Sequence, residues 1–152
     1  MWRPWVQSDT IEIRGLPDGE YEIEVRALDE RAIPDITPAT VKFVVDDTPP
    51  SIFFPKKAFF KRGDVLRVEL WDYITKPEEI EVSYKIDNSE WTPWQKVDFN
   101  DRGLGIKLIR LPDEVGTHKV IVRARDKKGN IETREFYFDI GVPVKGIFSC
   151  SR

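Results

Sequence analysis

A strict alternation of apolar and polar residues is the feature that most limits what this chain can fold into. In "IEVSYKID", Ile80, Val82 and Tyr84 alternate with charged or small polar residues, and "VLRVEL" and "THKVIVRAR" repeat the pattern. A period of two places successive side chains on opposite faces of a β-strand, so that one face is buried and the other is solvated. No segment has a convincing period near 3.6, and Pro34 and Pro38 interrupt "RAIPDITPAT". The chain is therefore predicted to be all-β.

Turn signals separate these segments at short intervals. "DNS", "DRG", "LPD" and "DKKGN" supply the Asp, Asn, Gly and Pro residues that tight turns favour. Short strands with turns every 8–12 residues or so are typical of an antiparallel β-sandwich. Residues 51–140 supply about seven strands and are predicted to form a complete sandwich. Residues 1–46 supply only three, near 9–14, 20–28 and 39–46.

The alternation also predicts which side chains face the core. In "GIKLIR", Ile106 and Leu108 are expected to point inward. The residues expected to be buried in the complete sandwich are Ile80, Val82, Tyr84, Ile86, Val120, Val122, Phe136 and Phe138.

An internal repeat explains why residues 1–46 contain so few strands. Trp-x-Pro-Trp occurs at Trp2–Trp5 and again at Trp91–Trp94, and each copy is followed by Leu-Pro-Asp, Val-Arg-Ala and Asp. "VKFVVD" then aligns with "REFYFD". We interpret residues 1–46 as the C-terminal half of an immunoglobulin-like repeat and residues 51–140 as a whole one. Residues 47–50 form a Pro-stiffened linker, and 141–152 are expected to be a tail or the start of a further strand.

The composition excludes several classes of function. The 152 residues carry 24 Lys and Arg against 27 Asp and Glu, a net charge of −3 with both signs interspersed. Nucleic-acid binding favours a basic stripe, so no nucleic-acid partner is expected. No apolar run approaches the ~20 residues of a membrane span, and "MWRPWVQSD" lacks the pattern of a signal peptide. Few Asn, Gln, Met and Cys beside many Glu, Lys and Arg favour a thermostable protein.

No constellation of catalytic side chains stands out in the sequence, so the chain is predicted not to be an enzyme. The single histidine, His118, lies on the apolar face of a predicted strand, and we interpret it as a corner or core residue rather than a catalytic base or ligand. The single cysteine, Cys150, excludes an internal disulfide and a multi-cysteine metal site. Asp46 and Asp47 precede "TPP", but calcium takes six or more oxygen ligands. Neither a metal nor a cofactor is expected.

The tryptophans are the candidate ligand-binding residues, and two interpretations stay open. Trp71 is out of phase with the inward residues of "VLRVEL" and is expected to face solvent, while Trp91 and Trp94 flank a Pro turn. Aromatic rings presented on a β-sandwich stack on sugars, which favours a carbohydrate-binding module. The motif recurs in both halves, however, as a structural turn would, and Trp usually contributes to packing.

At these residues the sequence resembles a known group. "YKIDNSEWTPW" and "LPDGEYEIEVRALD" are similar to the triple-tyrosine domain, a fibronectin-III-like sandwich, and "VRARDKKGN" and "VDDTPP" are similar to bacterial and archaeal surface immunoglobulin-like repeats. The resemblance implies a corner tyrosine at Tyr21 that hydrogen-bonds to upstream backbone, a position taken by His118 in the second copy. The matching residues are Tyr84, Trp91 and Trp94, then Leu16, Gly19, Tyr21, Val25 and Ala27, and again Leu111, Gly116, Val122 and Ala124.

The resemblance implies an extracytoplasmic, secreted or cell-surface location and a role in spacing or joining neighbouring modules. Our main hypothesis is a structural or protein-binding module; the alternatives are a carbohydrate-binding module and the sensor portion of a signalling protein. Residues 1–46 lack the strands that would cover their apolar side chains, so we expect the chain to associate with itself through them. The residues expected at that contact are Ile11, Ile13, Val41, Phe43 and Val45.

Overall fold

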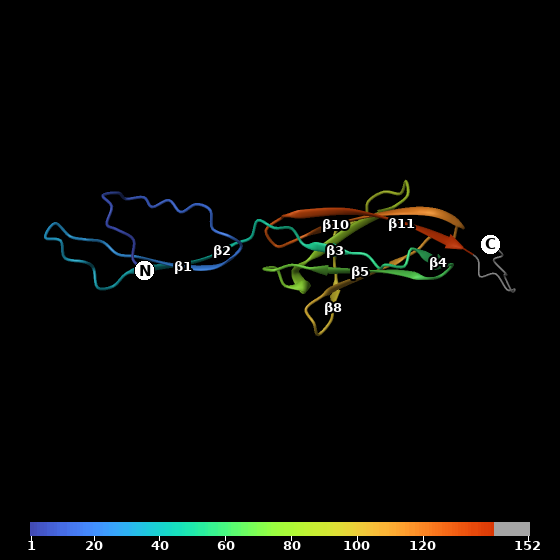
Figure 1. Cartoon of the computed structure of the whole chain (residues 1–152), viewed down its shortest axis with the longest axis horizontal. Coiled ribbons are helices and arrows are strands. Elements are labelled where there is room, and N and C mark those ends of the chain that lie inside the picture. Colours follow the sequence, from blue (N-terminus) through green and yellow to red (C-terminus); the bar gives the residue numbers. More distant parts are fainter. Residues whose placement is uncertain (142–152) are drawn as a thin grey trace, which may run out of the picture. The chain divides into compact units, whose positions relative to one another are not determined.

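The computed structural model describes residues 1–141, which form β-strands and one short 3-10 turn, Pro77–Glu79, with no α-helix among them. The chain divides into two compact units (Figure 1), Met1–Asp46 and Asp47–Arg152. We call them the first and the second unit. In the part of the chain that the structure describes, no helix has the length and apolarity needed to cross a membrane. The predicted C-terminal tail beyond Gly141, with Cys150, lies outside the described residues.

The second unit contains two β-sheets, which lie as two layers in Figure 1. One has the order β4-β11-β10-β6-β7 and the other β3-β5-β9-β8. All strand pairs are antiparallel except β4 with β11. The first sheet consists of β4 (Phe59–Lys61), β11 (Ile131–Gly141), β10 (Gly116–Arg125), β6 (Glu81–Ile86) and β7 (Gln95–Lys96). The second consists of β3 (Ser51–Phe53), β5 (Val65–Trp71), β9 (Gly105–Arg110) and β8 (Asp98–Phe99).

The two sheets enclose one apolar core, as in a β-sandwich. Leu66, Val68 and Leu70 from β5 are fully buried, and they form one cluster with Val120 and Val122 from β10. This is the pattern that strict alternation predicts, because every second side chain of both strands faces the opposite sheet. Of the residues predicted to be buried, Ile80, Val82, Val120, Val122 and Phe138 are buried, and Tyr84, Ile86 and Phe136 pack against the cluster in partly buried positions.

The predicted orientation of β9 is wrong. Leu108 is 54 % exposed, whereas Ile109 is fully buried and Leu111 nearly so. Apolar residues occupy both phases of this segment, so one of the two sets had to face solvent. Gly105 belongs to the inward set: a Cβ at this position would come within 2.9 Å of the Val97 side chain. The residues that face the core are therefore those in phase with Gly105, because the missing side chain of this glycine leaves room for Val97.

The first unit contains a single antiparallel hairpin of β1 (Gly19–Val25) and β2 (Ala39–Val45). The strand predicted over residues 9–14 is absent, because that segment pairs with no other strand in the described chain. An extended segment without a neighbour has no ladder of hydrogen bonds to hold it. Its polar side chains bond locally instead, as when Arg14 Nε donates to Glu12 Oε1 at 2.7 Å.

Candidate functional site

A stack of alternating cations and aromatic rings covers the outer face of the first sheet of the second unit. The guanidinium of Arg123 lies 4.2 Å from the ring centre of Trp91 and 4.7 Å from that of Trp94. Arg125 lies 4.3 Å from Trp94, and Lys85 Nζ lies 5.3 Å from Trp91. Each cation is attracted to the negative face of a ring. The rings of Trp91 and Trp94 are therefore occupied by the protein's own side chains.

The loop that carries these tryptophans is tied to β6 by backbone and hydroxyl groups. Tyr84 N–H donates to Thr92 Oγ1 at 3.0 Å, and Thr92 N–H donates to the Tyr84 carbonyl at 2.9 Å. Ser83 Oγ donates to the Thr92 carbonyl at 2.7 Å and is fully buried. The loop thus covers the outer face of β6, where a small serine leaves the space for it.

The first unit contains a smaller stack of the same kind. The guanidinium of Arg26 lies 4.0 Å from the ring centre of Trp2 and 5.3 Å from that of Trp5. Arg26 and Arg123 occupy the same place in the two Val-Arg-Ala sequences. In both, the Nε atom is buried and has no hydrogen-bond acceptor among residues 1–141. Stacking on a ring lets a weakly hydrated guanidinium leave water without a full set of acceptors.

Each unit also has a side chain at the start of a strand that bonds to backbone upstream, in β1 of the first unit and in β10 of the second. The Tyr21 hydroxyl donates to the carbonyl of Pro17 at 2.6 Å, and Tyr21 stacks on Phe43 at 5.6 Å. The bond from Tyr21 to upstream backbone is the one expected from the sequence. His118 Nε2 contacts the carbonyl of Glu114, also four residues upstream, at 2.8 Å. His118 is buried and stacks on Phe138 of β11 at 5.6 Å, as expected for a corner or core residue.

A third shared feature is the turn that follows each Val-Arg-Ala segment. Oδ1 of Asp29 accepts the backbone N–H groups two and four residues further on, at 2.8 and 2.9 Å. Oδ1 of Asp126 accepts the equivalent pair at the same distances. Both turns contain a left-handed residue, Ala32 with φ of 60° and Gly129 with φ of 94°. An aspartate at the start fixes such a loop because it replaces missing backbone partners.

Both ring nitrogens of His118 face oxygen acceptors. Nδ1 lies 2.7 Å from Oδ2 of Asp87, and Nε2 meets the carbonyl of Glu114. Only the protonated ring donates at both nitrogens. The hydrogen bond with Asp87 is the largest cause that raises the pKa of His118; burial opposes it, and the Glu114 carbonyl adds to the rise.

Asp87 shows the matching effect. Its Oδ1 accepts the backbone N–H of Lys119 at 2.9 Å. Burial raises the pKa of Asp87, but the hydrogen bonds from His118 and the Lys119 N–H outweigh it and lower the pKa below its ordinary value. When His118 is protonated the two side chains form an ion pair, and Asp87 connects β10 to the turn after β6 through its contacts with His118 and Lys119.

A comparison with known proteins found no family model and no curated protein that matches the chain.

Trp71, the third candidate for ligand binding, stands apart from Trp91 and Trp94 because it lies on β5, in the other sheet. Trp71 is 43 % exposed, as its phase along the strand predicts, and Tyr73, which is 70 % exposed, contacts its ring edge to face at 6.3 Å. The sequence analysis did not single out Tyr73. The three tryptophans do not form one platform.

Two acidic side chains of the second unit approach each other near the Asp126 turn. Asp72 and Asp126 bring carboxylate oxygens within 4.8 Å. Oδ1 of Asp72 accepts the N–H groups of Ile74 and Thr75 at 2.9 and 2.6 Å, so part of this acidic pair stabilises loops. The expectation of no bound metal remains a prediction.

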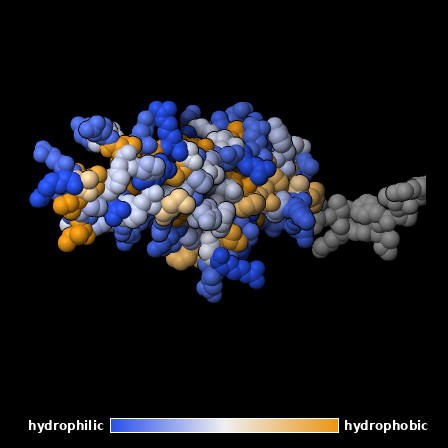
Figure 2. Space-filling model, turned by 60° about the vertical axis from the view of Figure 1, so that its left-hand side comes forward, coloured by the Kyte–Doolittle hydropathy of each residue, from blue (hydrophilic) through white to orange (hydrophobic). Residues whose placement is uncertain are grey.

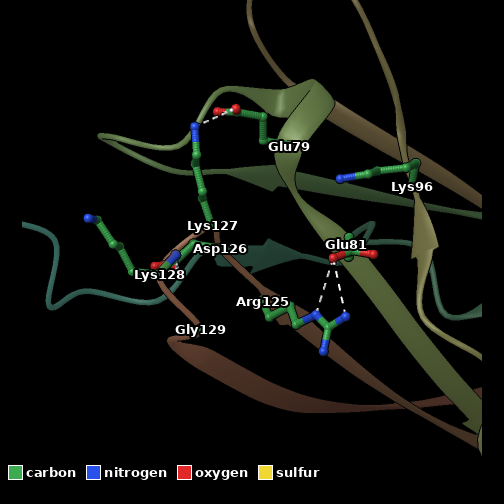
Figure 3. Close-up of a pocket in the computed structure, with 8 residues that line it drawn as sticks. All are labelled: Glu79, Glu81, Lys96, Arg125, Asp126, Lys127, Lys128 and Gly129. Carbon is green, nitrogen blue, oxygen red and sulfur yellow. Dashed lines mark hydrogen bonds and ion pairs between the residues drawn. The ribbon is translucent and has the colours of Figure 1, made fainter.

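A surface pocket of about 450 Å³ lies beside this turn (Figure 3). Two ion pairs cross it, from Lys127 to Glu79 at 3.0 Å and from Arg125 to Glu81 at 3.2 Å. Its remaining lining residues are Lys96, Asp126, Lys128 and Gly129. Charged side chains and one glycine line the pocket, and the two ion pairs hold Glu79 and Glu81 in place.

The residues predicted for self-association lie on the hairpin face with Tyr21 or before the hairpin. Phe43 lies opposite Tyr21 and Val41 opposite Ile23, so these side chains share one face. Val41 is 56 % exposed, and Phe43 and Val45 are only partly buried. Ile11 is exposed and Ile13 partly buried, both outside any strand. Apolar side chains reach the molecular surface among charged ones, as the orange residues of Figure 2 show.

The arginines of the stacks were not singled out from the sequence. The available signal was the arginine shared by both Val-Arg-Ala copies, on the polar phase of each strand. An arginine on the solvated face of both Val-Arg-Ala segments, in a chain with two Trp-x-Pro-Trp motifs, indicates an aromatic partner on that face.

Replacement of Arg123 by alanine is expected to lower the free energy of unfolding of the second unit by about 1–2 kcal/mol, because Trp91 and Trp94 each lose one of their two stacked cations. Urea unfolding followed by tryptophan fluorescence measures the change. Arg110→Ala is the matched control, since Arg110 is an exposed arginine of β9. Equal small effects for both variants would show that the stack contributes nothing specific.

Proposed function

We propose that this chain is a non-enzymatic spacing and protein-interaction module, built from an immunoglobulin-like or fibronectin-III-like sandwich preceded by the C-terminal half of the same repeat. The strand orders support the sandwich assignment. The order β3-β5-β9-β8 corresponds to strands A-B-E-D of an immunoglobulin domain, and β11-β10-β6 to its strands G-F-C. By the family resemblance, the module belongs to a secreted or cell-surface protein.

Three paired features support the half repeat. Each unit has a corner bond to the carbonyl four residues upstream, an arginine stacked on two tryptophans and an aspartate-led turn. Strand pairing refines the alignment of the last strand. Phe43 lies opposite Tyr21 as Phe138 lies opposite His118, so Phe43 corresponds to Phe138. The alignment of "VKFVVD" with "REFYFD" instead matches Phe43 with Phe136, two positions earlier.

The exposed apolar face of the first hairpin is the observation that carries the proposal. In the second unit, Phe138 is 1 % exposed because a second sheet covers the hairpin. In the first unit the corresponding residue, Phe43, is only partly buried, and Val41 on the same face is 56 % exposed. Burial of apolar surface contributes about 25 cal/mol per Å², and a two-stranded hairpin is marginal alone. We propose that two copies pack these faces together about a two-fold axis.

Light scattering on the whole chain tests this role. At about 50 µM the wild-type protein is expected to have twice the chain mass of 17.7 kDa. Phe43→Asp and Val41→Glu should return it to the monomer, because each places a charge in the apolar contact. Phe99→Asp is the control, since Phe99 is an exposed residue of β8 in the second unit. A monomeric wild type, or dimer loss in the control as well, would contradict the proposal.

A second candidate function is carbohydrate binding by Trp71 and Tyr73. It is favoured by their shared exposure and contact, whereas Trp91 and Trp94 carry arginines on their faces. Titration calorimetry with neutral oligosaccharides would detect binding that Trp71→Ala removes. Heat that Trp94→Ala removes instead would assign the sugar to the stack.

A further inference from the structure

Strand β1 has one edge that no described strand covers. β1 pairs with β2 along its seven residues, from Gly19 opposite Val45 to Val25 opposite Ala39, and these two strands make up the sheet. Beyond that ladder, the backbone of residues 19–25 makes no hydrogen bond to other backbone within the described chain. An uncovered edge of this length is a template for one more strand.

The second unit shows what fills the corresponding edge. β10, which matches β1 in the proposed repeat, pairs with β11 on one side and with β6 on the other. There Val120 lies opposite Ile86 and Val122 opposite Tyr84, so the added strand extends the apolar face of the hairpin. In the proposed repeat, the counterparts of Val120 and Val122 are Ile23 and Val25.

The other face of β1 is acidic and aromatic. Glu20, Glu22 and Glu24 alternate along it and are exposed, and only Glu22 has an ion-pair partner on β2, Lys42 at 3.4 Å. Among the described residues, Arg26 is the one cation stacked on Trp2, which stays 47 % exposed. In the second unit a lysine of β6 adds a further cation over the corresponding ring, Trp91.

We propose that the open edge of β1 binds an extended segment of a partner protein, antiparallel to β1, in which apolar residues alternate with Lys or Arg. The apolar residues lie beside Ile23 and Val25 and widen the apolar face. The basic residues lie beside Glu20 and Glu24, and one stacks on Trp2 as Lys85 stacks on Trp91 in the second unit. This proposal deepens the interaction role proposed above and rests on the repeat on which that role is built.

A second copy of the chain does not fit this edge. Two β1 strands paired antiparallel about a two-fold axis, with their apolar faces on one side, would place the glutamates of one copy beside those of the other. Like charges directly opposite each other on neighbouring strands are destabilising. Packing of two apolar faces, as proposed for self-association, leaves the edge of β1 open. The two contacts are therefore separate and can be tested apart.

The test is a titration of the whole ¹⁵N-labelled chain with two octapeptides, recorded by backbone amide shifts. One peptide alternates lysine with valine and tyrosine; its twin carries glutamate in place of each lysine. The lysine peptide is expected to shift the amides of Gly19–Val25 in a saturable way and to bind roughly tenfold or more tightly than its twin, because several weak charge pairs change sign. Exchange of Glu20 and Glu24 for lysine should reverse the preference.

Equal shifts with both peptides, no shifts up to about 1 mM, or shifts confined to β2 would overturn the proposal. An unreversed preference in a Glu20→Lys, Glu24→Lys variant whose spectrum is otherwise unchanged would do the same. If that variant misfolds, the difference in affinity of the wild-type chain for the two peptides still tests the proposal. Light scattering on the same samples separates the two contacts. A monomer that binds the lysine peptide refutes only self-association, and a dimer that does not bind it refutes only the edge site.

Discussion

Phe138→Ala is expected to lower the free energy of unfolding of the second unit by about 3–5 kcal/mol, the range for a buried phenylalanine truncated to alanine. Phe138 is 1 % exposed. Its ring contacts Phe60 edge to face at 5.9 Å and stacks on Phe136 at 6.2 Å and on His118 at 5.6 Å. Truncation leaves a cavity that three rings line, and packed strands on both sides of β11 limit its collapse.

Urea unfolding followed by circular dichroism measures this loss. Tyr137→Ala is the matched control, because Tyr137 is the preceding residue of the same strand and is mostly exposed. It should change the stability by no more than about 0.5 kcal/mol. If the two variants lost equal stability, the assignment of inward and outward faces along β11 would be wrong.

The second unit is expected to lose stability as the pH rises through the raised pKa of His118. The pKa of His118 is raised in the folded state above its ordinary value of 6.5. A raised pKa means that the folded state binds the proton more tightly than the unfolded state does. This contribution is complete below pH 6.5 and is lost as the pH rises through the raised pKa of the folded protein.

The same ion pair weakens at low pH. The pKa of Asp87 is lowered from its ordinary value of 3.8, so its contribution is complete above that value and is lost as the pH falls through the lowered pKa. His118 and Asp87 together favour a stability maximum between the two ordinary values. Urea midpoints measured from pH 3 to pH 9 should show this maximum. His118→Phe should remove the decline on the alkaline side, and Asp87→Asn should reduce it. A wild-type stability that rises from pH 6 to pH 8 would contradict the assignment.

The sequence predicted strands well where only one phase was apolar. In β10, Ile121 is the single apolar residue of the outward phase between Thr117 and Arg125, and Val120 and Val122 of the other phase are fully buried as expected. In β9, apolar residues occupy both phases, so the alternation alone did not decide between Leu108 and Ile109. The contact that decides is the one between Val97 and Gly105. The alternation within β9 does not report this contact, which depends on how β8 and β9 pair.

The absent strand near residues 9–14 has a different cause. Ile11 and Ile13 alternate as a strand would, but alternation reports only a segment's local preference. A strand also needs a neighbour that supplies hydrogen bonds, and within the described residues the sheet of the first unit has only β1 and β2.

The sequence predicted the roles of the corner residues in the candidate site, but it did not predict the contacts between residues on different strands. The positions of Tyr21 and His118 at the start of a strand indicated their corner role, because such a residue meets backbone a few positions away. Arg123 reaches Trp91 and Trp94 through a loop that folds over the sheet, and Asp87 reaches His118 from the end of another strand. These partners are brought together by strand pairing, which spacing in the sequence does not report.

Amide hydrogen exchange at two protein concentrations tests most directly whether the first hairpin is an open half that association completes. At about 1 µM, the amides of β1 and β2 should exchange at least 100-fold faster than those of β10 and β11, because a lone hairpin opens readily. At about 100 µM, β2 around Val41 and Phe43 should exchange at least tenfold more slowly, while β10 and β11 stay unchanged. Hairpin exchange that is equally slow at both concentrations would contradict the account, because the face would then be covered without a second copy.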